Sequence, residues 1–473
     1  MRRFRAQLAR SLQQSHGDFR TIFHIPRKTL TGLPPQLAVM LLSFALGGTF
    51  AEALTPFEDD PRLLNYGLLL LAAALLCFTR LLRRPSRTAR PIGSAGLLLL
   101  AFHGYAALIT FCKAEDPASL VKVVLFCCVA LCALQAARLL EPAELLAALF
   151  WSLLMIVMAS TVIAVAIPTI GVTPFVRGDA WTGIYGQKNA FGRQAALLGL
   201  LSLLMLLQPQ HASRLIPAAA LFLAIAGLYM SLSRTSLVLF ICGAVVIFVA
   251  AYLHRQIWSA GLLGGLACIM ASELQFIQAP ASIEITPYGI VFSDHFIDLT
   301  GRIPVWEFSW WLFRQEPLWG SGFDAIWTYA GGSSLYDALG WRLTDSHNGY
   351  LDLLVQTGLI GALLYGAVLC LTTTTALRLM LSGHPKSLEQ AMIALFALLQ
   401  WLINLTSSQT TECLSLWNFL FLVMCFASTR HRRGVSLGIA RHAKIQHRDT
   451  VPRPPRIVVA RHPVHRAPEL ARL

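Results

Sequence analysis

The sequence predicts an all-α polytopic membrane protein with about twelve transmembrane helices and one large extracytoplasmic loop that contains short helices. Its 473 residues are 56% hydrophobic and only 13% charged, whereas a soluble protein is about 25% charged. Apolar stretches of about 20 residues, the length that crosses a bilayer, recur along the chain. The formal net charge of +14 is also distributed unevenly, as membrane topology requires.

The predicted elements begin with a basic cytoplasmic tail at 1–34. A transmembrane domain follows at 35–429, and its large periplasmic loop covers about 275–356. The basic segment 430–473 has little that could form a core and is expected to be a disordered cytoplasmic tail. The twelve spans are expected at 35–53, 64–80, 92–112, 118–137, 145–167, 190–208, 215–231, 235–253, 258–274, 357–377, 390–406 and 412–429.

The distribution of charge supports this topology. With both termini in the cytoplasm, the inner segments carry 28 Lys and Arg residues and six acidic residues, a net charge of +22. The outer segments carry 10 basic and 18 acidic residues, a net charge of −8. Cytoplasmic loops of membrane proteins are enriched in Lys and Arg. The basic surplus therefore indicates orientation rather than nucleic-acid binding, and the few outer cations become candidate functional residues.

Polar residues on the outer side gather in the segments 168–190, 231–236 and 275–356. In the first, Lys188, Asn189 and Arg193 converge where a helix begins after two glycines, which is typical of an anion-binding turn. A glycine-rich turn with interfacial cations explains the same pattern. In the second, Arg234 lies between two apolar runs. Because an arginine at membrane depth costs at least about 2.5 kcal/mol, Arg234 either binds an anionic group or extends to the interface.

The large outer loop is rich in tryptophan and contains two further pairs of candidate functional residues. Arg302 and Trp306 lie one turn apart at the start of a predicted helix and therefore share a face. His347 and Asn348 lie where another helix is expected to begin. The tryptophans of this loop are Trp306, Trp310, Trp311, Trp319, Trp327 and Trp341. Anchoring at the membrane interface and stacking on sugar rings both explain so many tryptophans in one loop.

Several motifs, in this order, resemble the O-antigen ligase (Wzy-C) superfamily across about residues 180–430. They are Ser231-Leu232-Ser233-Arg234-Thr235, Gly301-Arg302 with Trp306, Gly320-x-Gly322, Ser346-His347-Asn348-x-Tyr350-Leu351 and Gly358-Leu359-Ile360-Gly361. The segment Gly186-Gln187-Lys188-Asn189-Ala190 is more similar to the exopolysaccharide-polymerase (ExoQ-like) branch than to the ligases of lipopolysaccharide assembly.

The resemblance implies a glycosyltransferase of the bacterial inner membrane that acts on the periplasmic face. Its donor would be a glycan on a polyprenyl (undecaprenyl) diphosphate, and its acceptor would be a sugar hydroxyl. Arg234 and Arg302 match the arginines that engage the diphosphate, and His347 matches the histidine that deprotonates the acceptor. The residues expected to bind substrate are Lys188, Asn189, Arg193, Trp306 and Asn348.

Elementary chemistry agrees with these roles. Arginine binds phosphate oxygens bidentately and stabilises the negative charge that develops on a departing diphosphate. A neutral histidine, with an ordinary pKa near 6.5, is suited to remove a proton from a hydroxyl. Attack on the face opposite the diphosphate would invert the anomeric carbon. The outer loop has no Asp-x-Asp pair of the kind that holds a metal ion in other glycosyltransferases, so we expect metal independence and no cofactor.

Within the family, polymerisation of exopolysaccharide or O-antigen repeat units is favoured, and ligation of O-antigen to lipid A core is the alternative. A transporter or flippase for lipid-linked oligosaccharides is the alternative from another class, although transporters usually contain internal repeats. The expected partners are the undecaprenyl diphosphate-linked oligosaccharide, a glycan acceptor and the lipid bilayer. Other polysaccharide-assembly proteins are a further class of candidate partner. Nucleic acid is not expected as a partner.

Overall fold

The computed structural model describes most of the chain between residues 33 and 427. The predicted N-terminal tail, the ninth predicted span, Trp341 and the predicted tail 430–473 lie outside the described residues. The described ranges are 33–55, 60, 62–82, 92–114, 116–175, 178–207, 214–252, 283–286, 289–292, 295–298, 302–328, 344–381 and 388–427.

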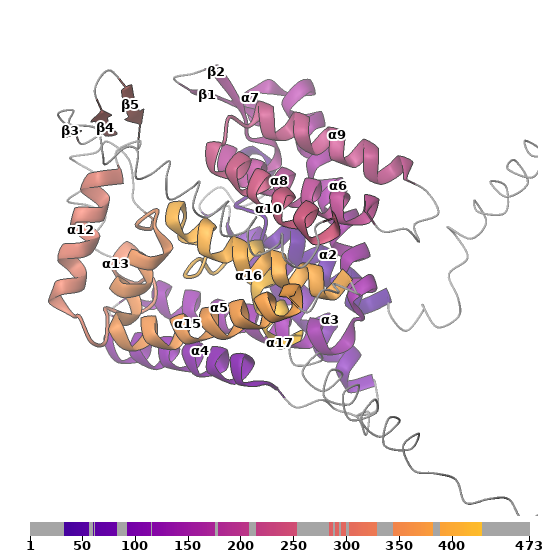
Figure 1. Ribbon diagram of the computed structural model, residues 1–473. Coiled ribbons are helices and arrows are strands. Elements are labelled where there is room, and N and C mark those ends of the chain that lie inside the picture. The colour runs from indigo at the N-terminus through magenta and orange to yellow at the C-terminus, as the bar shows by residue number, and fades with distance from the viewer. Residues whose placement is uncertain are drawn as a thin grey trace, which may run out of the picture. The chain divides into compact units, whose positions relative to one another are not determined.

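Helices make up most of the described structure (Figure 1). The α-helices are α2 (Leu33–Ala45), α3 (Arg62–Leu82), α4 (Ser94–Lys113), α5 (Pro117–Leu139), α6 (Pro142–Ala166), α7 (Pro168–Gly171), α8 (Lys188–Leu206), α9 (Leu215–Met230), α10 (Arg234–Tyr252), α12 (Arg302–Gln315), α13 (Ala325–Thr328), α15 (Gly349–Leu381), α16 (Leu388–Thr406) and α17 (Leu416–Ala427). Two 3₁₀ turns are η2 (Glu52–Leu54) and η3 (Gly183–Tyr185).

Six of the described helices are long and apolar enough to cross a membrane: α3, α4, α5, α6, α8 and α15 as far as Arg378. Five shorter apolar helices, α2, α9, α10, α16 and α17, contain the remaining apolar stretches found in the described residues. Together these helices correspond to every predicted span except the ninth. The predicted fold class, an all-α polytopic membrane protein, is therefore confirmed.

The helices pack in two groups that α16 connects (Figure 1). In one group, α8 packs against α6, α9 and α10. In the other, α15 packs against α4, and α17 packs against α4 and α5. Helix α16 contacts α10 on one side and α15 and α17 on the other. This arrangement brings helices that are distant in sequence around a shared interior.

Two small antiparallel sheets lie within the predicted outer segments, where only loops and short helices were expected. Strands β1 (Val172–Phe175) and β2 (Gly178–Trp181) form a hairpin in which Val172 pairs with Trp181. Strands β3 (Ile283–Thr286), β4 (Gly289–Phe292) and β5 (His295–Asp298) form a meander. Short-range hairpin pairing produces both sheets, because each strand pairs with its immediate neighbour in the sequence.

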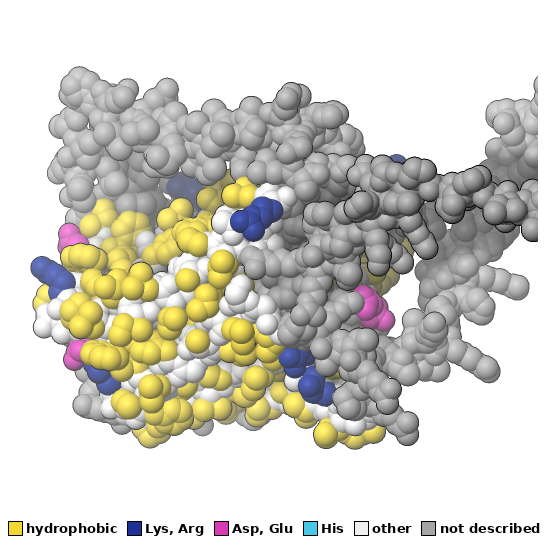
Figure 2. Space-filling model, turned by 60° about the horizontal axis from the view of Figure 1, so that its bottom comes forward, with side chains coloured by type: hydrophobic (Ala, Val, Ile, Leu, Met, Phe, Trp, Pro, Cys, Tyr) yellow, Lys and Arg dark blue, Asp and Glu magenta, His cyan; other side chains and the backbone are white. Residues whose placement is uncertain are grey.

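The outer surface of the helices is strongly apolar, as contact with lipid requires. Figure 2 shows hydrophobic side chains across most of the described surface in that view, with charged side chains toward its margins. Large side chains such as Leu71 and Phe78 on α3 and Leu108 and Phe111 on α4 are more than half exposed. In water such a surface would aggregate, so its exposure supports placement in a bilayer.

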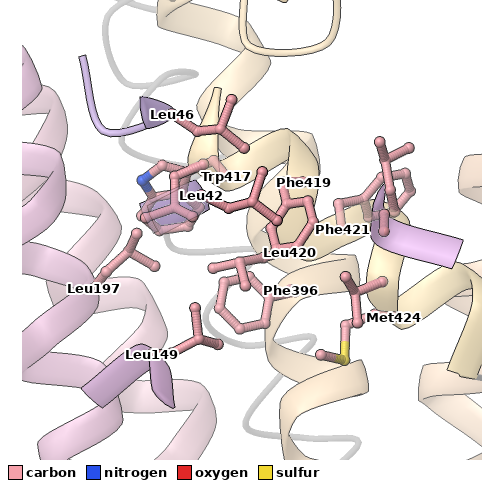
Figure 3. Close-up of a cluster of buried hydrophobic side chains, with 14 of the residues drawn as sticks. Leu42, Leu46, Leu149, Leu197, Phe396, Trp417, Phe419, Leu420, Phe421 and Met424 are labelled. Carbon is pink, nitrogen blue, oxygen red and sulfur yellow. The ribbon is translucent and has the colours of Figure 1, made fainter. Parts of the chain in front are cut away.

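The core is built around α17, which is buried on all its sides. Figure 3 shows side chains of α17, among them Trp417 and Phe421, packed with Leu42, Leu197 and Phe396 from other helices. A helix that is hydrophobic all round belongs in the interior of a bundle rather than at its surface. Although α17 has only 12 residues, all of them are buried, and it packs against α4, α5 and α16.

Helix α15 is broken at Gly358, and a loop docks into the break. Gly358 has φ +61° and ψ −167°, a conformation that is essentially restricted to glycine. The backbone N–H groups of Leu359 and Ile360 donate to the carbonyl groups of Pro317 and Leu318, at 2.9 Å and 3.3 Å. The loop thus satisfies backbone groups that the break leaves unpaired, as non-helical backbone inside a membrane protein requires.

The same loop then runs into the interior. The N–H of Phe323 donates to Thr110 Oγ1 at 2.7 Å, and the N–H of Asp324 donates to Gln356 Oε1 at 3.0 Å. Asp324 also pairs with Lys122 of α5. These contacts fix the segment 317–328 against α4, α5 and α15.

Candidate functional site

A cavity of about 1460 Å³ opens where the ends of many helices meet. Residues from six of the segments that connect successive spans line this cavity. The predicted topology assigns all six segments to the outer side. Representative lining residues, in chain order, are Glu52 before α3, Asp116 before α5, Gln187 before α8, Leu232 before α10, Asp345 before α15 and Ser408 before α17. Because successive spans alternate in direction, every second connection is expected on the same side.

Charged side chains are concentrated in this cavity. Its basic lining residues are Arg62, Lys122, Lys188, Arg193, Arg234 and Arg302. Its acidic lining residues are Glu52, Asp60, Asp116, Asp324, Asp345, Asp352 and Glu412. Such a concentration of charge within an apolar helical bundle is a functional-site signal, because each charge is costly to remove from water.

Six of the eight predicted site residues line the cavity. These are Lys188, Asn189, Arg193, Arg234, Arg302 and His347. Trp306 and Asn348 are not among its lining residues. The amide oxygen of Asn348 instead accepts from the N–H groups of Tyr350 and Leu351, at 3.0 Å and 3.2 Å, so this side chain caps the start of α15.

The start of α8 and the break between α9 and α10 form one wall. Ser233 Oγ donates to Asn189 Oδ1 at 3.0 Å and also contacts Ser236 Oγ at 2.9 Å. A Cβ added at Gly192 would lie 2.8 Å from Ser233 Cβ, which shows how closely the two segments approach. Glycine at this position therefore allows Lys188 at the start of α8 and the α9–α10 break to line the same space.

Arg234 is the first residue of α10 and is exposed in the cavity. The preceding Leu232 has φ +51°, a left-handed conformation that is rare outside glycine. Among the residues that the structure describes, neither Arg193 nor Arg234 lies within 4.0 Å of a carboxylate oxygen. Their positive charge is thus available to an anion that enters the cavity.

Arg302 is the first residue of α12, which packs against α15. Its charge acts on the imidazole of His347, although the two residues are 45 positions apart in the sequence. The predicted partner on its face, Trp306, has a buried indole N–H with no acceptor among the described residues. The structure thus brings Arg302, but not Trp306, to the cavity.

His347 is held in a tight turn by Asp345. One carboxylate oxygen, Asp345 Oδ1, accepts from the backbone N–H of His347 at 2.6 Å and lies 2.9 Å from its ring Nδ1. His347 has φ +53°, so the backbone is left-handed where the ring folds back over the carboxylate. The two side chains are 28% and 29% exposed, which leaves them accessible from the cavity.

Burial and charge shift both members of this pair. Burial lowers the pKa of His347, but the charge of Asp345 and its hydrogen bond outweigh burial and raise that pKa above its ordinary value. Burial raises the pKa of Asp345, yet the charge and hydrogen bonds of His347 hold it well below its usual range. The pair therefore favours an ionised carboxylate beside a readily protonated imidazole.

A second buried carboxylate, Asp352, connects three segments beneath the cavity. Its Oδ1 accepts from Trp327 Nε1 at 2.8 Å, and its Oδ2 accepts from Thr411 Oγ1 at 2.7 Å and from Gln356 Nε2 at 3.0 Å. The N–H of Ser346 also points to Oδ1 at 3.4 Å. Asp352 thus links the His347 turn to α13 and to the segment before α17.

Several residues that line the cavity were not predicted from the sequence to have a role. They are Arg62, Lys122, Asp324, Asp345, Asp352 and Glu412. Arg62, Lys122 and Glu412 lie at or near the outer ends of predicted spans, whereas the three aspartates lie in the large outer loop. For Arg62 and Lys122, the scarcity of cations on the outer side was the available signal. Glu412 interacts electrostatically with Arg193, another lining residue.

The tryptophans of the outer loop fall into different environments. Trp310, Trp311 and Trp319 are about half exposed, which fits interfacial anchoring. Trp327 is buried and lines the cavity. Within the described residues, no group of three or more His, Cys, Asp or Glu side chains is arranged to hold a metal ion; metal independence stays a prediction.

The fold and the cavity define a polytopic α-helical membrane protein with a site lined by basic and acidic side chains where the ends of its helices meet. Residues 219–366 match the family described as O-Antigen ligase. This match confirms the resemblance to the O-antigen ligase superfamily, and it includes Arg234, Arg302 and His347. It supports an enzyme of the O-antigen ligase or polymerase type in general terms. No curated protein matches the chain.

Proposed function

We propose that this protein is a glycosyltransferase of the bacterial inner membrane that transfers a glycan from a polyprenyl (undecaprenyl) diphosphate to a sugar hydroxyl on the periplasmic face. The single observation that carries the proposal is the composition of the cavity, in which cations from three separate segments line the same space as His347. The match of residues 219–366 to the O-antigen ligase family supports it, because that range includes Arg234, Arg302 and His347.

The cations suit the donor. As the bond between the anomeric carbon and the diphosphate breaks, its electron pair leaves with the phosphate oxygen, and negative charge grows there. Arg234 and Arg302 would bind those oxygens and stabilise the growing charge. Lys188 and Arg193, at the start of α8, would hold the remaining phosphate oxygens in the same cavity.

His347 suits the acceptor. A sugar hydroxyl gives its proton to the imidazole while its oxygen forms a bond with the anomeric carbon. Attack from the face opposite the diphosphate inverts that carbon. The protonated imidazole afterwards loses its proton to water, which restores the enzyme. No metal ion is needed in this scheme, because the arginines carry the charge stabilisation.

We favour polymerisation of exopolysaccharide or O-antigen repeat units, because the segment from Gly186 to Ala190 is similar to the exopolysaccharide-polymerase branch. In that case the acceptor is a second lipid-linked repeat unit, and other polysaccharide-assembly proteins act with the enzyme. Ligation of O-antigen to lipid A core uses the same cations and histidine with a different acceptor, and it is the alternative within the family.

The test supplies purified protein in lipid nanodiscs with a lipid-linked repeat unit and no other acceptor. A ladder of longer lipid-linked glycans supports a polymerase, and product that forms only with added lipid A core supports a ligase. We expect Arg302→Ala to reduce the rate by about 10²–10³-fold. Arg314→Ala is the matched control, because Arg314 lies at the exposed far end of the same helix.

Two results would overturn the proposal. Full activity of Arg302→Ala would remove the arginine from the chemistry, and translocation of the lipid-linked glycan without a new glycosidic bond would indicate a transporter or flippase. A chelator should leave the rate unchanged, and loss of activity on chelation would contradict the metal-independent scheme.

A further inference from the structure

We propose that Asp345 is a positioning residue that forms a carboxylate–imidazole pair with His347 and fixes the imidazole in the tautomer that accepts the proton of the acceptor hydroxyl. This inference rests on the proposed function and deepens it. From the sequence, His347 is expected to act as the base, whereas no role is expected for Asp345, two positions before it.

The geometry of the turn carries the proposal. Asp345 Oδ1 contacts both the backbone N–H of His347, at 2.6 Å, and ring Nδ1, at 2.9 Å. Two contacts to one oxygen fix the ring relative to its own backbone. His347 has a left-handed φ of +53°, a conformation that is rare and strained for a residue other than glycine, and in it the ring folds toward a carboxylate only two positions away.

The surrounding contacts hold the strained turn in place. Ser346 Oγ donates to the carbonyl of Asn348 at 2.7 Å, and Asn348 caps α15 at the following residues. The N–H of Ser346 faces the buried carboxylate of Asp352. Backbone strain that is held by several independent contacts is typical of functional sites. Leu232 and Asp324, the other described non-glycine residues with positive φ, also line this cavity.

The chemistry of the pair determines the tautomer. An ionised carboxylate only accepts hydrogen bonds, so the hydrogen between Asp345 Oδ1 and ring Nδ1 belongs to the imidazole. The neutral ring therefore carries its proton on Nδ1, and the lone pair on Nε2 accepts the proton of the acceptor hydroxyl. The carboxylate then stabilises the imidazolium that forms, as in other carboxylate–histidine pairs.

Other charges also act on the ring. Arg302 at the start of α12 opposes protonation of His347, whereas Asp352 in α15 favours it. Glu412 and Asp324 in turn interact with Asp345. Of these groups, Asp345 has the strongest influence on the charge of the imidazole, which makes its removal measurable in a pH profile.

The experiment measures kcat/KM for glycosyl transfer between pH 5 and 9 with the lipid-linked repeat unit as both donor and acceptor. The variants are Asp345→Asn, Asp345→Glu and the matched control Asp179→Asn. Asp179 is exposed on strand β2 and is not among the residues that line the cavity, so the control makes the same substitution outside the site.

We expect Asp345→Asn to lower the plateau rate by about 10²–10⁴-fold, because the amide favours the wrong tautomer. The rising limb of its pH profile should move to lower pH, because loss of the carboxylate lowers the pKa of His347. Asp345→Glu keeps the charge, so its limb should stay near that of the unaltered protein even if its rate falls. Asp179→Asn should leave both the rate and the position of the rising limb unchanged.

An unchanged rate and limb in Asp345→Asn would overturn the inference, and so would a lower rate with an unmoved limb, which would mean that Asp345 only holds the turn. Asp345→Glu provides the test if Asp345→Asn is not monodisperse, because a limb displaced in Asp345→Glu contradicts the charge argument. His347→Ala, measured alongside, separates the two proposals. If His347→Ala is fully active, the proposed function fails, whereas an inactive His347→Ala with an unaltered Asp345→Asn removes only this inference.

Discussion

The break in α15 gives a prediction about stability that depends on one glycine. In Gly358→Ala, the added Cβ would lie 2.3 Å from the carbonyl oxygen of Leu318 and 2.6 Å from the backbone nitrogen of Gly320. Both atoms belong to the backbone of the docked loop, so neither can move away without moving the loop. The position also has φ +61° and ψ −167°, which alanine adopts only with strain.

The expected destabilisation follows from these two effects. The backbone strain costs about 1–3 kcal/mol. Displacing the loop also breaks the hydrogen bonds that Leu359 and Ile360 donate to it, each with a net value of about 1 kcal/mol. The free energy of unfolding should therefore fall by about 3–5 kcal/mol. Transfer activity should fall as well, because the displaced segment carries Asp324 and Trp327 into the cavity.

Gly366→Ala is the matched control, because it makes the same substitution in the same helix. A Cβ at Gly366 meets no atom within 4 Å, and alanine is favoured over glycine in a helix by up to about 1 kcal/mol. Thermal unfolding in one detergent, followed by tryptophan fluorescence, should show Gly358→Ala melting well below the unaltered protein and Gly366→Ala melting at or above it. Equal melting temperatures for the two variants would refute the reasoning.

Two further predictions concern charge. Lys122→Met removes the ion pair between Lys122 and Asp324, whose side chains are 17% and 13% exposed, and should destabilise the protein by about 1.5–3 kcal/mol. Thermal unfolding should show that adding Asp324→Asn recovers part of this loss, and a double variant no more stable than the single one would contradict the pairing. The pair of Asp345 and His347 should stabilise the fold most fully between about pH 4 and pH 6.5. Because folding raises the pKa of His347, the stability that the pair contributes is lost as the pH rises through the pKa of His347 in the folded protein. Because folding lowers the pKa of Asp345, the same stability is lost at the other end only in stronger acid. The difference in melting temperature between the unaltered protein and Asp345→Asn should therefore narrow from pH 6 to pH 9, and a constant difference would argue against the charge interaction.

Several features could be predicted from the sequence because they depend on local composition. A segment in hydrocarbon must satisfy its own backbone hydrogen bonds, so a run of about 20 apolar residues predicts a helix whatever surrounds it. The start of α12 at Arg302 and the helix after His347 followed from the same kind of local pattern. Scarcity of cations on the outer side pointed to Arg234 and Arg302, both of which line the cavity.

Other features could not be predicted because they join residues that are far apart. Lys122 and Asp324 are 202 positions apart, and nothing in either segment identifies the other as its partner. The glycines at 320 and 358 were visible as motifs, but their close approach depends on how the loop meets the break in α15. Trp306 shared a predicted face with Arg302, yet the packing of α12 keeps it out of the cavity lining.

The sequence by itself determined that the protein is a membrane protein, where most of its helices lie and which charges are out of place among them. It did so because hydrophobicity and charge act on each segment separately. Only the tertiary structure decided that six connections meet at one cavity and that Asp345, rather than a residue distant in sequence, holds His347. The place of this turn beside the cavity depends on Asp352, which ties it to Trp327 and Thr411, and those contacts exist only when the helices are packed together.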